Sequence, residues 1–310
     1  MNQDLLKAGL ISQSGECIVL LSRYLLTLNE GDRILPKGEL AKRYHIGVGT
    51  VQTAFKTLES TNAAHINSRG HLGSFVTFMD RDLLWQYSLY GYVRGTMPLP
   101  YHDILVGLAT GINNIFNQNS GIMVRMSYVR GSRARIENVS EGLDDFTICS
   151  LFAAKYAVAH GKDVHLFKSF SDNTYIGQTV LLVRKGISLG DGITVGIDSA
   201  SFDQDKLTKE LFKDMDVNYK TVQYNNFHDM LNSRQIDACV WSEEDVRGFD
   251  GEIVHLPGKM AETINDAGRA AIVVSNQSRD KMKSVEDRFD IEKIEKIQRD
   301  IIEKKEIPNY

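Results

Sequence analysis

The apolar residues of the first 80 positions follow a pattern that predicts three helices and then a short hairpin. In residues 16–28, 39–44 and 50–61 they recur every three or four positions, which places them on one face of an α-helix. Two short runs, 64–66 and 74–78, flank a segment rich in turn-forming residues and predict two paired β-strands.

This order of elements predicts an α+β winged helix-turn-helix domain over residues 1–79. In such a domain the second helix of the pair enters the major groove of DNA, while the hairpin reaches the backbone or the minor groove. We expect the apolar face of helix 50–61 to pack in the core and its polar face to meet DNA. The residues predicted to contact DNA are Lys37, Thr50, Gln52, Thr53, Lys56, Arg69 and His71.

From residue 80 to 310 the pattern changes to alternating strands and helices, which predicts an α/β domain. Strands are predicted in a first set at residues 87–97, 122–129, 145–149 and 164–167, and in a second set at 177–184, 193–197, 219–224, 236–241 and 269–275. Helices are predicted at residues 101–118, 133–142, 150–160, 202–215 and 227–232.

The two similar sets predict two lobes with a cleft, joined by connections near residues 178–184 and 269–275. The first lobe is predicted to span about residues 86–182 and 268–290, the second lobe about 190–265, and a C-terminal helix about 279–305. A narrow apolar stripe on that helix is expected either to pack on this domain or to form a dimer seam. The stripe consists of Ile291, Ile294, Ile297 and Ile301.

Charge is divided unevenly along the chain. The 310 residues carry a net charge of −4, with 42% hydrophobic and 25% charged residues, as in ordinary soluble proteins. Residues 33–78 hold six basic and two acidic residues, a net charge of +4. A basic module on an acidic chain favours DNA as its partner, although helical domains that bind no nucleic acid also carry such charge. No apolar run could span a membrane and no targeting segment is visible, so we expect a cytoplasmic protein.

Candidate ligand-binding residues lie in loops that follow the carboxyl ends of strands, where open α/β sheets bind ligands. They are Pro98, Tyr101, Arg130, Gly131, Ser132, Arg133, Ser150, Asp198, Ser199, Ser201, Trp241 and Glu243. The arginines suit a carboxylate or phosphate and the serines an anion at a helix start, but ion pairs and helix caps use the same residues. The tryptophan either stacks on a ligand or fills the cleft floor. The two acids either bind an amine or pair with neighbouring bases.

Motifs for catalysis are absent, since the sequence has no Gly-x-Ser-x-Gly, no phosphate-binding loop and no His-Glu-x-x-His. Cys17, Cys149 and Cys239 have no C-x-x-C spacing and are expected to be reduced, buried apolar residues. We therefore predict no enzyme activity, no metal and no cofactor.

The first domain resembles the GntR-type winged-helix domain over about residues 15–78. The resemblance rests on Leu35-Pro36, Glu39-Leu40-Ala41, Thr50-Val51, Ala54, Leu58-Glu59, Arg69-Gly70 and Gly73-Ser74-Phe75-Val76. The interval from Leu35-Pro36 to Leu40 is one residue shorter than in that family, and arginines common in its recognition helix are here Val48, Gln52 and Thr53. Gln52 still suits bidentate pairing with adenine, but phosphate anchoring is weakened.

The second domain resembles the type 2 periplasmic-binding-protein fold. The resemblance rests on Val139-x-x-Gly142-x-Asp144-Asp145 before Cys149-Ser150, and on Gln235-Ile236-Asp237-Ala238. With Met97-Pro98-Leu99-Pro100-Tyr101 and Lys56-Thr57-Leu58-Glu59-Ser60, nearly the whole chain resembles bacterial YhfZ-type proteins, a GntR-like head on such a sensor. The resemblance implies an α/β two-lobed periplasmic-binding-protein-like domain (type 2) preceded by an α+β winged helix-turn-helix domain.

These patterns predict a transcription regulator with two kinds of partner. The winged helix is expected to bind a double-stranded DNA operator as a homodimer, and the two-lobed domain to bind a small polar, anionic effector. Two alternatives stay open. One is a metabolite-binding module that uses its head for dimerisation, which the departures at Val48, Gln52 and Thr53 motivate. The other is an enzyme that acts in the cleft.

Overall fold

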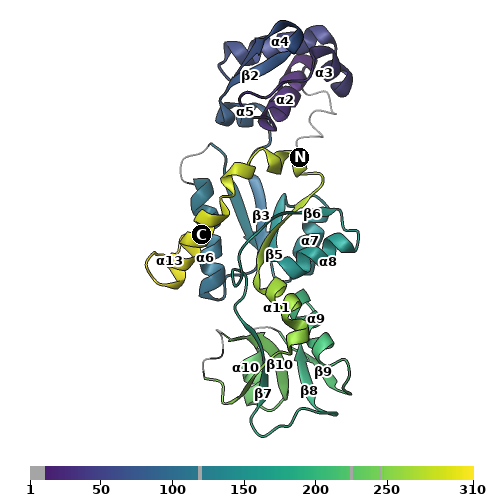
Figure 1. Cartoon of the computed structure of the whole chain (residues 1–310), viewed down its shortest axis with the longest axis vertical. Helices are drawn as coiled ribbons and strands as arrows, with labels where there is room; N and C mark the ends of the chain where they lie inside the picture. The colour runs from purple at the N-terminus through teal and green to yellow at the C-terminus, as the bar shows by residue number, and fades with distance from the viewer. Residues whose placement is uncertain (1–10, 118–120, 224–225, 244–245, 247) are drawn as a thin grey trace. The chain divides into compact units, whose positions relative to one another are not determined.

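The computed structural model describes residues 11–117, 121–223, 226–243, 246 and 248–310, and its chain forms two compact units (Figure 1). The described residues up to Val93 belong to the first unit, together with those of Phe116–Arg125 and Arg279–Arg288. The remaining residues form the second unit. The predicted ends of a helix at residue 118 and of a strand at residue 224 lie outside the described residues. The domain division near residue 80 stays a prediction.

The first unit contains the predicted helix-turn-helix and hairpin. Its elements are α2 (Gln13–Leu26), α3 (Lys37–Tyr44), α4 (Val48–Ser60), β1 (Ala64–Ser68), a 3-10 turn (Gly70–Leu72) and β2 (Ser74–Met79). Ser12 caps α2 by accepting a hydrogen bond from the Gly15 N–H, and His45 ends α3 in the left-handed conformation, with φ of 55°. The buried face of α4 consists of Val51, Ala54, Phe55 and Leu58, as predicted. Strands β1 and β2 pair antiparallel, and we call this hairpin, residues 64–79, the wing.

The predicted strand 87–97 is wrong in its first half. Its first residue belongs to helix α5 (Arg81–Tyr87), and a turn follows. Asp80 caps this helix with its side chain, and the Trp85 indole N–H donates to the Gly91 carbonyl at 2.7 Å. Apolar residues in so short a stretch fit a helix or a strand, and here the cap and the tertiary contact decide for the helix.

The second unit is built around two five-stranded sheets, which confirms the predicted two-lobed α/β architecture. The first sheet has the order β4-β3-β5-β12-β6, with β3 (Val93–Met97), β4 (Val124–Tyr128), β5 (Phe146–Ser150), β6 (Val164–Ser169) and β12 (Ala270–Ser275). The second sheet has the order β11-β7-β10-β8-β9, with β7 (Thr179–Arg184), β8 (Thr194–Ile197), β9 (Asn218–Thr221), β10 (Ala238–Ser242) and β11 (Gly251–His255). We call each sheet with its helices a lobe.

Helices cover both faces of each sheet. On the first sheet, α7 (Ser132–Ser140) and α8 (Leu151–Ala159) lie opposite α6 (Asp103–Asn117) and α13 (Ile291–Ile302) (Figure 1). In the second lobe, Leu181 and Val183 of β7 pack in one core with residues of α9 (Phe202–Leu211) and α11 (Ala261–Gly268). Val180 and Leu182 pack in another core with residues of α10 (Phe227–Asn232). This alternation along β7 is that of a strand buried on both faces. Helix α11 and strand β11 were not predicted.

The connections between the lobes lie beside the predicted segments, because residues 179–184 and 270–275 are themselves strands of the two sheets. Residues 170–178 lead from β6 to β7, and Gly268 and Arg269 lead from α11 to β12. The Tyr175 N–H donates to the Gly268 carbonyl at 2.9 Å, and Arg269 Nε donates to the Phe170 carbonyl at 3.0 Å. The two connections are therefore hydrogen-bonded to each other.

The predicted C-terminal helix 279–305 is broken into α12 (Arg279–Lys283), a 3-10 turn (Glu286–Arg288) and α13. Asp290 starts α13 by accepting a hydrogen bond from the Lys293 N–H. The stripe residues Ile294, Ile297 and Ile301 are buried. Gly111 of α6 lies directly against Ile294. The stripe thus packs within the chain, and its buried isoleucines present no seam to a second copy.

Two further observations bear on the predicted chemistry. Over the described ranges, no helix is both long and apolar enough to cross a lipid bilayer. Cys17, Cys149 and Cys239 are buried, as predicted, and burial raises the pKa of the Cys149 thiol to about 12. A thiol held protonated in this way is a poor nucleophile.

Candidate functional site

Three of the seven residues predicted to contact DNA lie on the exposed side of α4. Those that are exposed on this helix are Gln52, Thr53 and Lys56. Thr50 is half-buried. The helix begins at Val48, two residues before the prediction, so its first turn adds Val48 and Gly49 to the exposed side.

The same domain carries basic residues that are all exposed: Arg33, Lys37, Lys42, Arg43, Lys56 and Arg69. Within residues 29–79, every one of which the structure describes, none of these side chains forms an ion pair. The Arg69 guanidinium lies 4.8 Å from the Phe75 ring centroid, which holds it against the wing. His71 is exposed in the 3-10 turn at the wing tip.

Two acidic groups of this domain are bonded to its own backbone. The Glu30 carboxylate accepts from the Met79 N–H at 3.0 Å, and the Asp32 carboxylate accepts from the Asn29 N–H at 2.8 Å. Because these carboxylates are engaged in the fold, the exposed cations remain available to an external polyanion. Phosphate groups of a DNA backbone are the partners that such a surface suits.

A pocket of about 920 Å³, counting the part that is open to solvent, lies in the second unit. The predicted ligand residues that line it are Pro98, Tyr101, Arg130, Gly131, Ser132, Asp198, Ser201 and Trp241. Polar lining residues that the sequence analysis missed include Arg135, Tyr175, Thr179, Asp203 and Gln204. The loops that follow β3, β4 and β8 supply most of the predicted residues, in agreement with the rule for open α/β sheets.

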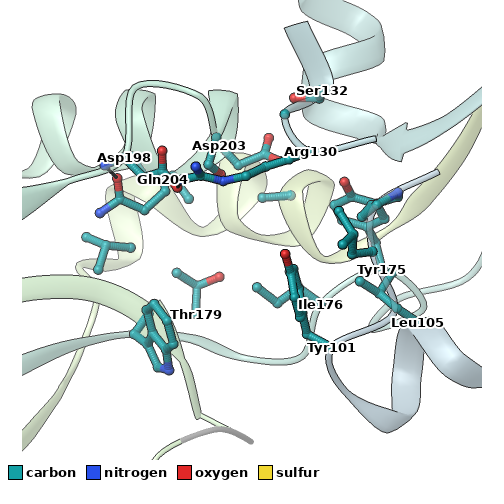
Figure 2. Close-up of a pocket in the computed structure, with 18 of the residues that line it drawn as sticks. Tyr101, Leu105, Arg130, Ser132, Tyr175, Ile176, Thr179, Asp198, Asp203 and Gln204 are labelled. Atoms are coloured by element: carbon teal, nitrogen blue, oxygen red, sulfur yellow. Dashed lines mark hydrogen bonds and ion pairs between the residues drawn. The ribbon is translucent and has the colours of Figure 1, made fainter. Parts of the chain in front are cut away.

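An ion pair joins the two lobes at this pocket. Arg130 Nη2 lies 2.6 Å from Asp198 Oδ2, and the Asp198 side chain is only 4% exposed. The Asp198 carboxylate also accepts from the Ala200 N–H, while the Asp198 N–H donates to the Gln204 side chain at 2.7 Å. Figure 2 shows the Arg130 side chain extending toward Asp198, with Tyr101 and Thr179 across the pocket. A ligand anion that takes Arg130 must therefore compete with a fixed carboxylate.

Arg135 lines the pocket and is a buried cation, because only 1% of its surface is exposed. Its Nη1 donates to the Val129 carbonyl at 2.7 Å, and its Nη2 donates to the Tyr175 hydroxyl at 3.0 Å. Its Nε is buried and has no hydrogen-bond partner among the described residues. Burying a guanidinium N–H without an acceptor is costly, but an atom this enclosed is out of reach of a molecule in the pocket unless the surrounding side chains move. Arg135 was not predicted, because it lies inside α7 and not in a loop at the end of a strand.

Asp203 faces the same pocket from α9. Burial raises the pKa of this carboxyl to about 6, although a hydrogen bond from Ser150 and the positive charge of Arg135 oppose the rise. Ser150 Oγ donates to Asp203 Oδ1 at 2.7 Å. The first lobe thus supplies the cations Arg130 and Arg135, and the second lobe supplies Asp198 and Asp203. The pocket has walls of opposite charge.

Four predicted residues do not line this pocket. Ser150 caps α8 and contacts Asp203 from behind. Ser199 is exposed to solvent. Arg133 Nη2 pairs with Asp205 at 2.8 Å and lines a neighbouring hollow instead. The Glu243 N–H donates to the Gln178 carbonyl. Their positions follow from neighbours that are distant in sequence.

Trp241 lines the pocket, and the two roles predicted for it both stay predictions. Only 3% of its surface is exposed, and its ring packs edge-on against Phe227, with 5.1 Å between ring centroids. In the part of the chain that the structure describes, no three His, Cys, Asp or Glu side chains are grouped to hold a metal ion.

Comparisons with known proteins match both parts of the chain. The family described as YhfZ C-terminal domain matches residues 80–310, and a family described as Helix-turn-helix domain matches residues 29–76. The YhfZ protein of Escherichia coli (strain K12) is 33% identical over 232 residues, which are 75% of this chain and 75% of that protein. The narrower GntR-type resemblance stays a prediction.

Solved structures show the same fold. YhfZ from Shigella flexneri is 25% identical with a TM-score of 0.64, over 74% of this chain and 98% of that chain. An ancestral arginine-binding protein bound to arginine is 17% identical with a TM-score of 0.50, over 70% of this chain and 98% of that chain. The periplasmic aliphatic sulphonate binding protein SsuA from Escherichia coli is 13% identical with a TM-score of 0.51, over 69% and 75% of the two chains. The last two comparisons establish the fold alone.

The fold and the site therefore define a class of protein. A helix-turn-helix domain is followed by a periplasmic-binding-protein-like domain with a pocket, which points to a ligand-sensing transcription regulator rather than an enzyme. The chain belongs to the YhfZ family.

Proposed function

We propose that this protein binds an operator in double-stranded DNA through α4 and the wing, and that a small metabolite in the pocket changes its affinity for that operator. The exposed polar side of α4, in a domain whose six exposed cations form no ion pair over residues 29–79, carries this proposal. Such a surface gains affinity by releasing counterions from DNA. The regulator acts in the cytoplasm, as a homodimer on two half-sites.

The ligand that best fits the pocket is a small polar metabolite with an anionic group. That group takes the Arg130 guanidinium in place of Asp198. An amine on the same ligand fits the opposite wall, where Asp198 and Asp203 lie. The released Asp198 carboxylate then gains a new cation, so the exchange leaves no buried charge unpaired.

The DNA half of the proposal is tested by fluorescence anisotropy across a salt series. The probes are DNA from upstream of the gene for this protein and a scrambled control. We expect preferential binding that weakens steeply with salt. The Lys56→Gln variant should lower the slope of log affinity against log salt by about 1. The matched control is Lys185→Gln, because Lys185 is equally charged, 74% exposed and lies in the second unit.

The ligand half is tested by thermal shift and tryptophan fluorescence with amino acids, amines, carboxylates and sulphonates. We expect a ligand that stabilises the wild type and fails to stabilise Arg130→Gln. The control is Arg133→Gln, which removes the same charge from a residue outside the pocket. That ligand should also shift the DNA affinity of the wild type. Ligand binding without DNA binding would favour a metabolite-binding module, and turnover of the ligand would favour an enzyme.

A further inference from the structure

We infer that α4 reads A·T base pairs, through thymine methyl groups and one adenine, and that the operator half-site is built from such pairs. This inference rests on the proposed function, since it names which DNA the helix recognises. The recognition helix of a helix-turn-helix meets base edges with its N-terminal residues. In α4 the exposed residues of this part are Val48, Gly49, Gln52, Thr53 and Lys56.

Val48 is an exposed apolar residue at a position where a helix surface facing only water would carry a polar one. It is the first residue of α4, and 45% of its surface is exposed. The apolar feature of the major groove is the 5-methyl group of thymine, because the other base edges there present hydrogen-bond donors and acceptors. An isopropyl group in this position gains free energy by covering such a methyl group.

Gly49 lets the helix approach the base edges closely. A Cβ placed on it would meet no atom of the protein within 4 Å, so the protein itself does not require a glycine there. Glycine in a helix destabilises it relative to alanine. The missing side chain leaves space beside Val48 for a base edge.

Thr53 turns its hydroxyl toward the helix. Its Oγ1 donates to the Gly49 carbonyl at 3.0 Å, and Thr57 bonds to the Thr53 carbonyl in the same way at 3.1 Å. Because the hydroxyl hydrogen of Thr53 is engaged, the groups that remain for a base are its methyl group and the lone pairs of its hydroxyl oxygen. Threonine methyl groups make apolar contact with thymine.

Gln52 supplies the hydrogen-bonding part of this surface. Its exposed amide has one acceptor and two donors, the set that matches the N6 and N7 atoms of adenine. Arginine, which forms the commonest specific contact with guanine, is missing from α4, all of which the structure describes. Lys56 lies one turn beyond Gln52, where we assign it to a phosphate.

The first step of the test selects bound sequences from random double-stranded DNA with the full chain. We expect enriched half-sites in which two thymines and one adenine are nearly invariant. Replacing each of these thymines by deoxyuridine, which lacks only the 5-methyl group, should weaken binding about fourfold, the free energy of burying one methyl group. Replacing the adenine by 7-deazaadenine removes the N7 acceptor and should weaken binding about tenfold.

Matched variants assign each base to a residue. Thr53→Ser keeps the hydroxyl and loses the methyl, so it should bind about fourfold more weakly and become insensitive to deoxyuridine at one position. Thr53→Val keeps a methyl in this place and should retain both affinity and sensitivity. Val48→Ala should lose sensitivity at the other position, and Gln52→Ala should no longer distinguish 7-deazaadenine from adenine.

The outcomes separate this inference from the function on which it rests. Salt-dependent, sequence-selective binding with G·C pairs at the invariant positions would overturn the reading of A·T pairs and leave the regulator intact. Equal binding to thymine and deoxyuridine DNA, or equal losses for Thr53→Ser and Thr53→Val, would do the same. Failure to enrich any DNA would overturn both.

Discussion

The positive charges of the winged helix and those of the pocket differ in what surrounds them. Over residues 29–79 the six exposed cations form no ion pair, whereas at the pocket Arg130 holds Asp198 of the other lobe. Unpaired exposed cations gain from a long polyanion, whose counterions they release. A cation that is already paired with a carboxylate gains free energy only from a ligand that interacts with it more favourably than this carboxylate does. The first surface suits a polymer of phosphates, and the second suits one shaped small molecule.

The largest expected effect is on the stability of the fold, and it concerns a cation that lines the pocket. Arg135→Met removes a buried guanidinium that donates to the Val129 carbonyl and the Tyr175 hydroxyl. We expect a loss of about 3 kcal/mol in the free energy of unfolding, because hydrogen bonds from a charged group are lost and their acceptors stay buried. Urea unfolding measures it.

The matched change in the winged helix is Arg69→Met. Arg69 is exposed and forms no ion pair within the described range 29–79, so the unfolding free energy should change by less than about 0.5 kcal/mol. Its effect should appear in DNA affinity instead. Equal losses of stability in the two variants would contradict the contrast between the regions.

A smaller effect concerns the carboxylate wall of the pocket. The Asp203 carboxyl has a pKa of about 6 in the folded chain, against about 3.9 for an aspartate in an unfolded one. The folded state thus binds the proton more tightly, and the stability this confers is full below about pH 4 and lost as the pH rises through 6. Asp203→Asn, which can still accept from Ser150, should remove this dependence.

The difference between wild type and Asp203→Asn in unfolding free energy should change by about 1 kcal/mol between pH 4 and pH 7, since solvent screens this partly exposed group. Urea titrations of both proteins at several pH values measure it. A difference that stays constant over this range would show that the carboxyl is not perturbed by the fold.

The smallest expected effect separates stability from recognition at α4. Gly49→Ala should raise the free energy of unfolding by about 0.5 kcal/mol, because alanine is the better helix former and its Cβ meets no atom within 4 Å. DNA affinity should fall, since the added methyl group enters the space left for a base edge. A variant that is more stable and binds DNA equally well would place the DNA elsewhere on the domain.

Sequence patterns predicted the elements that depend on local periodicity. The faces of α2 and α4, and the strands of both sheets other than β11, follow from the spacing of their apolar residues. The first half of the strand predicted at 87–97 is wrong, because a contact of Trp85 with Gly91 outweighs a short apolar run, whereas its second half is β3. Loop positions such as Arg130 and Asp198 were found because strand ends mark them.

The residues that were missed depend on contacts between distant segments. Arg135 looks like any polar residue of a surface helix until the packing of β12 and the 170–178 segment encloses it. Asp203 gains its raised pKa from burial, against the opposing effects of Ser150 and Arg135 on the other lobe. Neither position carries a local signal, because burial of a charged side chain is set by tertiary structure.

The paired connections between the lobes limit how those lobes can move. The Tyr175 to Gly268 and Arg269 to Phe170 hydrogen bonds make two chain segments bend together, so they act as one hinge with a shared axis. Twisting or sliding of one lobe on the other would break these bonds, while opening about the axis keeps them. Because Arg135 also donates to the hydroxyl of Tyr175, a side chain that lines the pocket is bonded directly to this hinge.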